Sequence, residues 1–280
     1  MGSSYGIMAV LADFLRSILH DPAHPLSLHS GGFVFLFLGF IVLWALLREY
    51  HVWRLRWLLA FSFYYYYRCN GRYALVLASL CVADWLIGLR LHRAEGRSTR
   101  KAWTIFGVAI NLATLGVFKY LGFFLRESSA LLGHSLPVWQ PFLPIGISFH
   151  VFQSISYLVD IYKKRQEPSK GLLDYALYLS FFPQVVAGPI VRAAEFLPQI
   201  RRKLNPTRED ISTGLFLVLQ GVVKKAVLAD YLGGYTDLVL GFPAGYSGFE
   251  VLLATYAYAA QIFLDFSGYS DMALGLGRIL

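Results

Sequence analysis

Seven apolar stretches restrict the fold of this chain more than any other feature of its sequence. They lie at residues 32–47, 53–67, 73–91, 103–125, 142–162, 211–232 and 249–266. Most approach the roughly 20 residues that a helix needs to cross about 30 Å of hydrocarbon. Hydrophobic residues make up 56% of the chain and charged residues 15%, against roughly 25% charged in a typical soluble domain. This composition, together with the length of the apolar stretches, excludes a soluble enzyme, a disordered chain, a collagen-like chain and a disulfide scaffold. It predicts an all-α, polytopic transmembrane helical bundle with about seven or eight spans.

The positive charges are distributed unevenly among the connections between these stretches. Connections 48–56, 90–101, 163–170 and 192–208 hold 17 Lys and Arg residues, whereas connections 68–72, 126–141 and 233–248 hold three. Cations in short loops mark the cytoplasmic side of a membrane protein. The first set is therefore predicted to be cytoplasmic and the N-terminus extracytoplasmic. The formal net charge of +8 is explained by this sidedness, and no nucleic-acid partner is expected.

The first residues differ from the apolar stretches that come after them. Residues 1–20 place apolar side chains at helical spacing, with Asp13 and Arg16 between them. This pattern is too polar for a signal-peptide core and predicts a helix lying in the membrane interface. We therefore expect an N-terminal interfacial helix and loop over residues 1–30 and a transmembrane domain over residues 31–280.

Residues 172–191 do not fit a simple alternation of spans. They are apolar, yet basic connections flank them on both sides. Pro183 and the Gly188–Pro189 pair interrupt a helix, and irregular backbone at membrane depth requires surrounding protein or a water-filled cavity. The segment is predicted to be re-entrant, entering from and returning to the cytoplasm beside a functional cavity.

Polar residues within apolar stretches are the next candidates, because ionisable groups there are costly and point to function by default. Lys224 and Lys225 fall in the middle of a stretch, so either the helix is broken there or the pair faces water. The four consecutive tyrosines at positions 64–67 are predicted to be interface anchors with no chemical role.

Two stretches are densest in polar side chains. His150, Gln153, Ser154 and Tyr157 are spaced to share one helix face, and that face could bind neighbouring helices or line a cavity. Asp265 and Asp271 bracket a Ser-Gly-Tyr-Ser core at residues 267–270. These carboxylates could perform acid–base work or bind a cation, but capping of two helices that meet at Gly268 is the more common role of such residues.

Four blocks together resemble one family, the membrane-bound O-acyltransferases, in its bacterial alginate O-acetylation branch. They are LPIGISFHVFQSISYLVDIY at 143–162, DYALYLSFFPQVVAGPIVR at 174–192, GVVKKAVLAD at 221–230 and LDFSGYSDMALGLGR at 264–278. The resemblance implies an integral enzyme of the bacterial inner membrane that carries an acyl group, most simply acetyl, to a hydroxyl through a tunnel across the bundle. The donor would be acyl-CoA or an acyl carrier, the acceptor an exported polysaccharide or a lipid-linked molecule, and a periplasmic acyltransferase a further partner.

The resemblance also implies a catalytic histidine in a Trp-His block downstream of the fourth of these blocks. No Trp-His pair occurs in the 280 residues, so the family histidine is expected after Leu280. We expect the chain to represent an N-terminal portion that is inactive alone, with no catalytic residue of its own. No metal or nucleotide motif occurs, and no bound cofactor is expected. The candidate tunnel- or substrate-lining residues are His150, Gln153, Ser154, Tyr157, Gln184, Pro189, Lys224, Asp265, Ser267, Tyr269 and Asp271.

Two other classes of protein remain open from the sequence. Intramembrane Asp, Lys and His residues also mark ion paths, which would suit a transporter or channel. Inverted repeats would favour that class, but the two halves of the chain show no convincing self-similarity. A non-catalytic membrane scaffold of an acylation system is the other alternative.

Overall fold

The computed structural model describes residues 19–22, 25–132, 142–202 and 205–280. Within these residues the regular elements are all helices and no strand occurs, which confirms the predicted all-α class. The predicted interfacial helix at residues 1–20 lies almost wholly outside the described residues. The chain divides into two compact units. The first comprises chiefly Leu46–Val186 and Ile190–Arg202, and the second Ser27–Ala45, Ala187–Pro189 and Lys203–Leu280.

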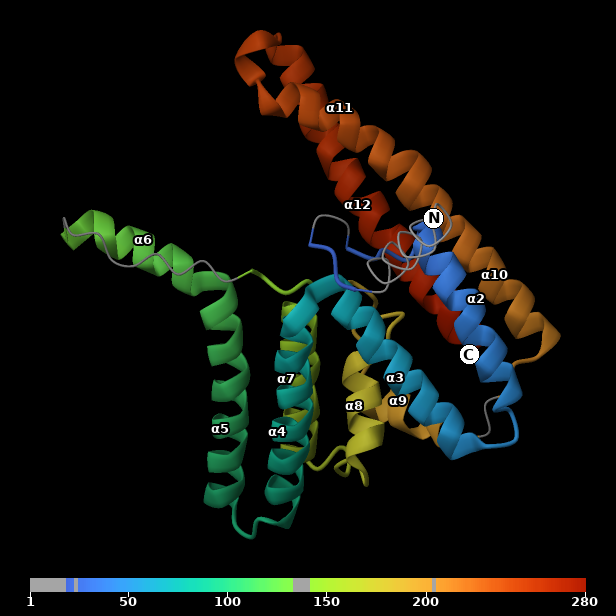
Figure 1. Ribbon diagram of the computed structural model, residues 1–280. Helices are drawn as coiled ribbons and strands as arrows, with labels where there is room; N and C mark the ends of the chain where they lie inside the picture. The colour runs from blue at the N-terminus through green and yellow to red at the C-terminus, as the bar shows by residue number, and fades with distance from the viewer. Residues whose placement is uncertain (1–18, 23–24, 133–141, 203–204) are drawn as a thin grey trace, which may run out of the picture. The chain divides into compact units, whose positions relative to one another are not determined.

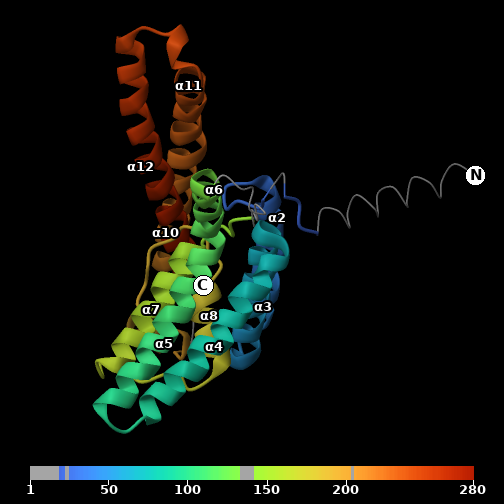
Figure 2. The same cartoon turned by 90° about the vertical axis from the view of Figure 1, so that its left-hand side faces the viewer.

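The first unit is a helical bundle in which α4, α5 and α7 pack side by side and α8 packs against α3 and α4 (Figures 1 and 2). Gly107 lets α5 approach α7 closely, because a Cβ atom at this position would lie 2.5 Å from the Leu158 side chain. The elements are α3 (His51–Asn70), the 3-10 turn η1 (Gly71–Tyr73), α4 (Ala74–Arg93), α5 (Arg97–Leu115), the π-helical η2 (Gly116–Tyr120), α6 (Leu121–Leu132), α7 (Ile147–Tyr162), α8 (Leu172–Ser180) and α9 (Ala193–Ile200).

The second unit contains a long helical hairpin (Figure 1). Its elements are α2 (Gly31–Leu46), α10 (Arg208–Val222), the π-helical η3 (Val223–Ala229), α11 (Asp230–Gly241), the 3-10 turn η4 (Pro243–Gly245) and α12 (Gly248–Ile279). Each arm begins with a capping box, Thr207 with Asp210 on α10 and Ser247 with Glu250 on α12. In such a box the hydroxyl and the carboxylate satisfy amide groups that the first helical turn leaves unpaired, so the sequence itself marks where each arm starts.

The two arms of this hairpin meet through glycines. A Cβ atom at Gly221 would lie 2.4 Å from the Gly268 carbonyl oxygen, and a Cβ atom at Gly275 would lie 2.4 Å from the Gly214 carbonyl oxygen. Small residues at a helix interface allow the backbones to approach closely, and this is a main source of helix association in membranes. Further along, Thr236 Oγ1 donates a 2.7 Å hydrogen bond to Oε1 of Gln261. The glycines therefore fix the contact between α10 and α12.

Helix α12 corrects one prediction from the sequence. It runs unbroken from Gly248 to Ile279, so Asp265 and Asp271 do not cap two helices that meet at Gly268. Gly268 is needed for close packing against Gly221 instead, and a glycine in this role does not interrupt the helix. The carboxylates of Asp265 and Asp271 therefore do not serve as helix caps at Gly268 and can contact other side chains.

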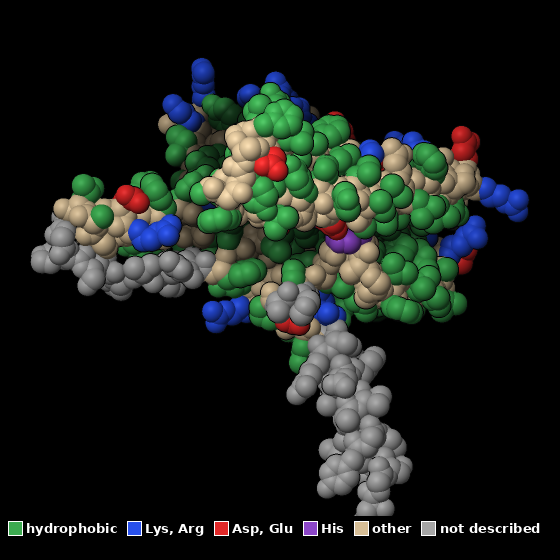
Figure 3. All heavy atoms as spheres, turned by 90° about the horizontal axis from the view of Figure 1, so that it is seen from above, with side chains coloured by type: hydrophobic (Ala, Val, Ile, Leu, Met, Phe, Trp, Pro, Cys, Tyr) green, Lys and Arg blue, Asp and Glu red, His purple; other side chains and the backbone are tan. Residues whose placement is uncertain are grey.

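Four helical segments among the described residues are long and apolar enough to cross a membrane. They are His51–Arg93, Arg97–Leu131, Arg208–Gly241 and Gly248–Ile279, and Gly31–Leu46 is a shorter apolar helix. The first segment contains two of the predicted spans, since the chain turns at η1 between α3 and α4 (Figure 1). Many large hydrophobic side chains on these helices are exposed, among them Phe35, Leu75, Phe216 and Phe263, and hydrophobic side chains cover much of the face shown in Figure 3. A surface of this kind suits contact with lipid rather than water.

The four tyrosines at the end of α3 do not all behave as predicted. Tyr65 and Tyr66 are buried, at 0% and 2% exposure. Tyr65 packs edge-on against Phe182 and Tyr66 packs edge-on against the His150 ring. The interpretation as interface anchors is therefore wrong for these two residues, because this face of α3 is covered by other helices of the first unit.

Candidate functional site

The segment predicted to be re-entrant, residues 172–191, forms the first arm and the turn of a short helical hairpin. Helix α8 ends at Ser180, a turn follows over residues 182–187, and α9 packs back against α8 through contacts of Phe196 with Tyr178 and Phe181. Nine residues of α8 rise only about 14 Å, so this helix is too short to cross a membrane alone.

Polar contacts join the two sides of this hairpin, one nearer its turn and one at its open end. The Tyr178 hydroxyl donates to the Val191 carbonyl oxygen at 3.1 Å, and Arg201 pairs with Asp174 at 3.2 Å. The last contact joins the end of α9 to the start of α8, so the chain leaves the hairpin beside the point where it entered. Of the predicted site residues, Gln184 is buried in the turn and donates to the Tyr178 carbonyl oxygen at 2.9 Å. Pro189 is partly exposed in the extended segment after the turn.

The turn of this hairpin packs on the start of α7. Gly146, in the left-handed region at φ +86°, leaves no room for a side chain, because a Cβ atom there would lie 2.3 Å from the Val185 carbonyl oxygen. Glycine is the residue that adopts this conformation at least cost. The LPIGIS block therefore joins the entry of α7 to the hairpin.

The predicted polar face of α7 lies inside the first unit. His150, Gln153, Ser154 and Tyr157 are all at most 3% exposed. The Ser154 hydroxyl lies 3.3 Å from the Tyr175 hydroxyl on α8, and the Tyr157 hydroxyl accepts a 3.0 Å bond from the Ser169 amide. The face thus contacts the hairpin and the connection that precedes it.

A buried carboxylate lies beside this face, and its hydrogen-bond partner could not be predicted from the sequence. Asp84 on α4 is 0% exposed, and its Oδ1 accepts a 2.7 Å hydrogen bond from Nδ2 of Asn111 on α5. Asn111 also donates to the Gly107 carbonyl oxygen at 3.0 Å. Both residues stand out in the sequence as polar within apolar stretches, but only the packing of α4 against α5 shows that they are partners.

His150 is a buried polar side chain of the first unit without hydrogen-bond partners among the described residues. Its ring is 1% exposed and lies edge-on to Tyr66 with ring centroids 5.2 Å apart. Neither ring nitrogen has a hydrogen-bond partner among the described residues. Buried polar atoms are nearly always paired, and an exception calls for an explanation, which can be functional.

The second unit holds a network of lysines and aspartates at its π-helical segment. Lys224 Nζ lies 2.6 Å from Asp271 Oδ2 and donates to the Ser267 hydroxyl at 3.0 Å. Lys225 Nζ lies 2.8 Å from Asp230 and 2.9 Å from Asp265. The helix is therefore not broken at this pair, and the alternative that the pair faces water stays a prediction. The helix is continuous and locally π-helical, and each ammonium meets a carboxylate of α12.

The π-helical geometry explains how two adjacent lysines can both reach acidic partners. Successive residues of an α-helix point about 100° apart, so one face cannot present both side chains equally. A π turn widens the helix locally, and such turns are frequent at functional sites. Intramembrane ionisable groups of this kind pair with one another and mark substrate or ion paths.

The structure therefore gathers the predicted site residues into two groups. His150, Gln153, Ser154, Tyr157 and Gln184 lie in the first unit, whereas Pro189, Lys224, Asp265, Ser267, Tyr269 and Asp271 lie in the second. The first group is a buried face with one unpaired imidazole, and the second centres on an ion-pair network.

Comparison with known proteins identifies the relatives of this chain. It is 32% identical over 267 residues to the peptidoglycan O-acetyltransferase of Helicobacter pylori, covering 86% of this chain and 50% of the relative. It is 36% identical over 263 residues to a probable alginate O-acetylase of Pseudomonas aeruginosa, covering 90% and 49%. The predicted resemblance to the membrane-bound O-acyltransferases is confirmed.

A more distant relative in this family is the teichoic acid D-alanyltransferase of Bacillus subtilis, 28% identical over 174 residues and matched over 59% of this chain and 43% of the relative. No family model matches the chain. The chain spans about half the length of the curated relatives that it matches. Together with the four apolar helical segments, these relatives establish a membrane protein.

Proposed function

We propose that the protein transfers an acyl group, in the simplest case acetyl, to a hydroxyl of a cell-envelope polysaccharide. The observation that carries this proposal is identity of 32–36% over nearly all of the chain to proteins named for O-acetylation of peptidoglycan and alginate. The acceptor oxygen bonds to the carbonyl carbon of the acyl group, the donor leaves, and the hydroxyl proton passes to a base. We assign no residue of this chain as that base.

The proposed topology is a multi-pass protein of the bacterial inner membrane with seven or eight spans and an extracytoplasmic N-terminus. The uneven distribution of Lys and Arg supports the sidedness. Residues 172–191, which comprise α8 and the turn after it, are proposed to be re-entrant from the cytoplasm. The ion pair between Asp174 and Arg201 supports this, since it keeps the two ends of the hairpin together.

The two groups of candidate residues are proposed to line the path of the acyl group. His150 supports this for the first group because its imidazole is buried and both ring nitrogens are unpaired among the described residues. Lys224 supports it for the second, because an ammonium held by Asp271 and Ser267 within an apolar helix indicates a polar passage. The donor is proposed to be acyl-CoA or an acyl carrier and no other cofactor is invoked. A periplasmic acyltransferase is proposed as partner.

Acetyl transfer by the full-length protein is the direct test. Membrane vesicles that contain it are supplied with acetyl-CoA or an acetylated carrier and with peptidoglycan or alginate, and ester-linked acetate is released by mild base and quantified. We expect ester in the presence of the protein, and a loss of at least about tenfold in a Gln153→Ala variant, since a mispositioned substrate commonly costs that much or more.

Phe152→Ala is the matched control for that variant. Phe152 neighbours Gln153 but is 52% exposed, so its removal leaves the buried face intact and the rate within about twofold of wild type. Absence of ester from inserted, folded protein with either donor and either acceptor would overturn the proposed function.

A further inference from the structure

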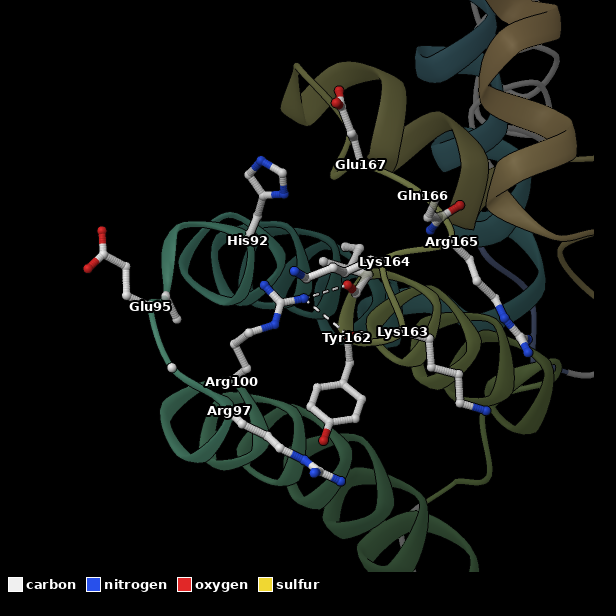
Figure 4. A pocket seen from close by; sticks show the side chains of 13 residues that line it. His92, Glu95, Arg97, Arg100, Tyr162, Lys163, Lys164, Arg165, Gln166 and Glu167 are labelled. Carbon is white, nitrogen blue, oxygen red and sulfur yellow. Dashed lines mark hydrogen bonds between the residues drawn. The ribbon is translucent and has the colours of Figure 1, made fainter.

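A cationic cavity lies in the first unit, and its lining includes none of the candidate residues. It has a volume of about 1170 Å³ and is lined by residues 92–100 around the α4–α5 connection and by residues 161–167 at the end of α7. Figure 4 shows it from close by. The cations of these connections indicate the cytoplasmic side, but sidedness does not require them to share a cavity.

The charge of this cavity is strongly unbalanced. Its lining carries five Lys or Arg residues and His92 against two glutamates, Glu95 and Glu167. In Figure 4 the side chains of Arg100 and Lys164 extend toward a common space, whereas those of Lys163 and Arg165 extend away from it. Cations that converge repel one another, so such an arrangement is stable when an anion joins them.

Arg100 forms the floor of the cavity and is fixed in place. Its guanidinium donates to the carbonyl oxygens of Leu91 at 3.0 Å, Ile161 at 2.9 Å and Tyr162 at 3.1 Å. The first acceptor is near the end of α4 and the other two are at the end of α7, where helices leave carbonyl groups unpaired. Arg100 therefore ties the two helix ends together and holds a positive charge at the base of the cavity.

Lys164 stands in a conformation that a lysine rarely adopts. Its φ is +56°, and among the described residues it is the one non-glycine residue with positive φ. Its amide donates to the Ile161 carbonyl oxygen at 3.0 Å, and the Arg165 amide donates to the Asp160 carbonyl oxygen at 2.9 Å. This is the helix-ending motif whose left-handed position is usually glycine.

A lysine at this position costs stability of the folded chain, and residues held in such conformations cluster at ligand-binding sites. Within the described residues the Lys164 ammonium has no ion-pair partner. The side chain therefore does not offset its own strain through contacts with the described protein.

We propose that this cavity binds a phosphate group, with Lys164 as its direct ligand above the fixed charge of Arg100. A phosphate offers several strong acceptor oxygens to converging donors. The phosphate can belong to a phospholipid headgroup or to a phosphorylated molecule in solution. The inference does not depend on the proposed acyl transfer, because binding is measured without donor or acceptor polysaccharide.

The test uses full-length protein in nanodiscs and two probes. Inorganic pyrophosphate, added to phosphatidylcholine nanodiscs, reports a soluble phosphate through calorimetry. Phosphatidylglycerol, mixed with phosphatidylcholine and measured on the released complex by native mass spectrometry, reports a lipid headgroup. Binding of either probe supports the proposed site and shows whether the phosphate belongs to a lipid or to a soluble molecule. If neither probe binds, the proposal is overturned.

Lys164→Gly is the decisive variant, because glycine suits the left-handed position and removes only the side chain. We expect the affinity for the bound probe to fall by about tenfold, the size expected for one charge-assisted contact, while thermal stability without probe stays the same or rises. Lys163→Ala removes the neighbouring cation, which extends away from the cavity, and should change affinity less than about threefold. Equal losses in both variants would indicate general surface attraction and would overturn the proposed site.

Discussion

Asp271 holds Lys224 within the network at the π-helical segment. Its carboxylate lies 2.6 Å from Lys224, and the two side chains are only 18% and 24% exposed. Asp271→Asn would leave the Lys224 ammonium with hydrogen-bond acceptors but without the negative charge that Asp271 supplies. We expect a loss of about 1–3 kcal/mol in the free energy of unfolding, measured by denaturant titration in detergent micelles.

Asp237→Asn provides the control for this substitution. Asp237 lies on α11 in the same hairpin but is exposed, so neutralising it should change stability by less than about 0.5 kcal/mol. Equal stability of the two variants would contradict the role given to the Lys224–Asp271 pair.

At the residue scale, the sequence identifies which polar side chains are unusual but not what they contact. Lys224, Asp265 and Asp271 stand out because each interrupts an apolar stretch. Their pairing could not be predicted, since it requires the π-helical turn that brings adjacent lysines to α12. Tyr65 and Tyr66 were predicted to be interface anchors but are buried. A tyrosine at the end of a span indicates the membrane interface only when no other helix covers it.

The contact between α10 and α12 rests on backbone proximity at Gly221. A Cβ atom there would lie 2.4 Å from the Gly268 carbonyl oxygen and 2.6 Å from Met272. We expect Gly221→Ala to lower the free energy of unfolding by more than about 2 kcal/mol, even though alanine favours an isolated helix by about 1 kcal/mol. Denaturant titration of the purified protein measures this.

Gly234→Ala tests the same substitution without the contact. Gly234 lies in α11 with open space around its Cβ position, so alanine there should be neutral or stabilising by about 0.5–1 kcal/mol. If Gly221→Ala were as well tolerated as Gly234→Ala, the glycines would not fix the packing of the two helices.

The contacts of the α8–α9 hairpin predict that both of its ends are accessible from the same side of the membrane. Lys170 and Arg202 are exposed just outside the hairpin, near the ends that Asp174 and Arg201 join. We expect cysteines substituted at these two positions to react with an impermeant maleimide from the same face of sealed vesicles. Labelling from opposite faces would show a complete span.

The wild-type protein supplies the background for that measurement. Both native cysteines, Cys69 and Cys81, are buried, so little labelling is expected without a substitution.

At the element scale, Pro183 and the Gly188–Pro189 pair were sufficient to predict that this apolar segment is not one regular helix. The exact turn over residues 182–187 could not be predicted, because it depends on packing against Gly146.

At the scale of the whole molecule, the charge distribution predicts which connections share a side. Glu95 lies in the cation-rich connection between α4 and α5, and Ala244 lies in the exposed turn between α11 and α12. We expect Glu95→Cys to be labelled from the cytoplasmic face and Ala244→Cys from the other. Labelling of both from one face would contradict the proposed sidedness.

The membrane character of the whole chain could be predicted because it depends on composition and on the lengths of apolar stretches, which need no contact information. The number of spans is harder to obtain. Two predicted spans form one helical segment that turns at η1, and α7 and α2 have 16 residues each. Length alone cannot classify such helices, since their ends depend on neighbouring loops.

The π-helical segment Val223–Ala229 also makes the hairpin sensitive to insertions and deletions. Each residue of an α-helix advances the chain by about 100° around its axis, and a π turn absorbs an extra residue without rotating the rest of the helix. Loss of one residue here would turn Gly233 and Thr236 away from Gln261, which they now contact. Alignments of related chains through this region must therefore preserve the angular phase of α11, whereas the turn at Pro243–Gly245 can vary in length without altering either arm.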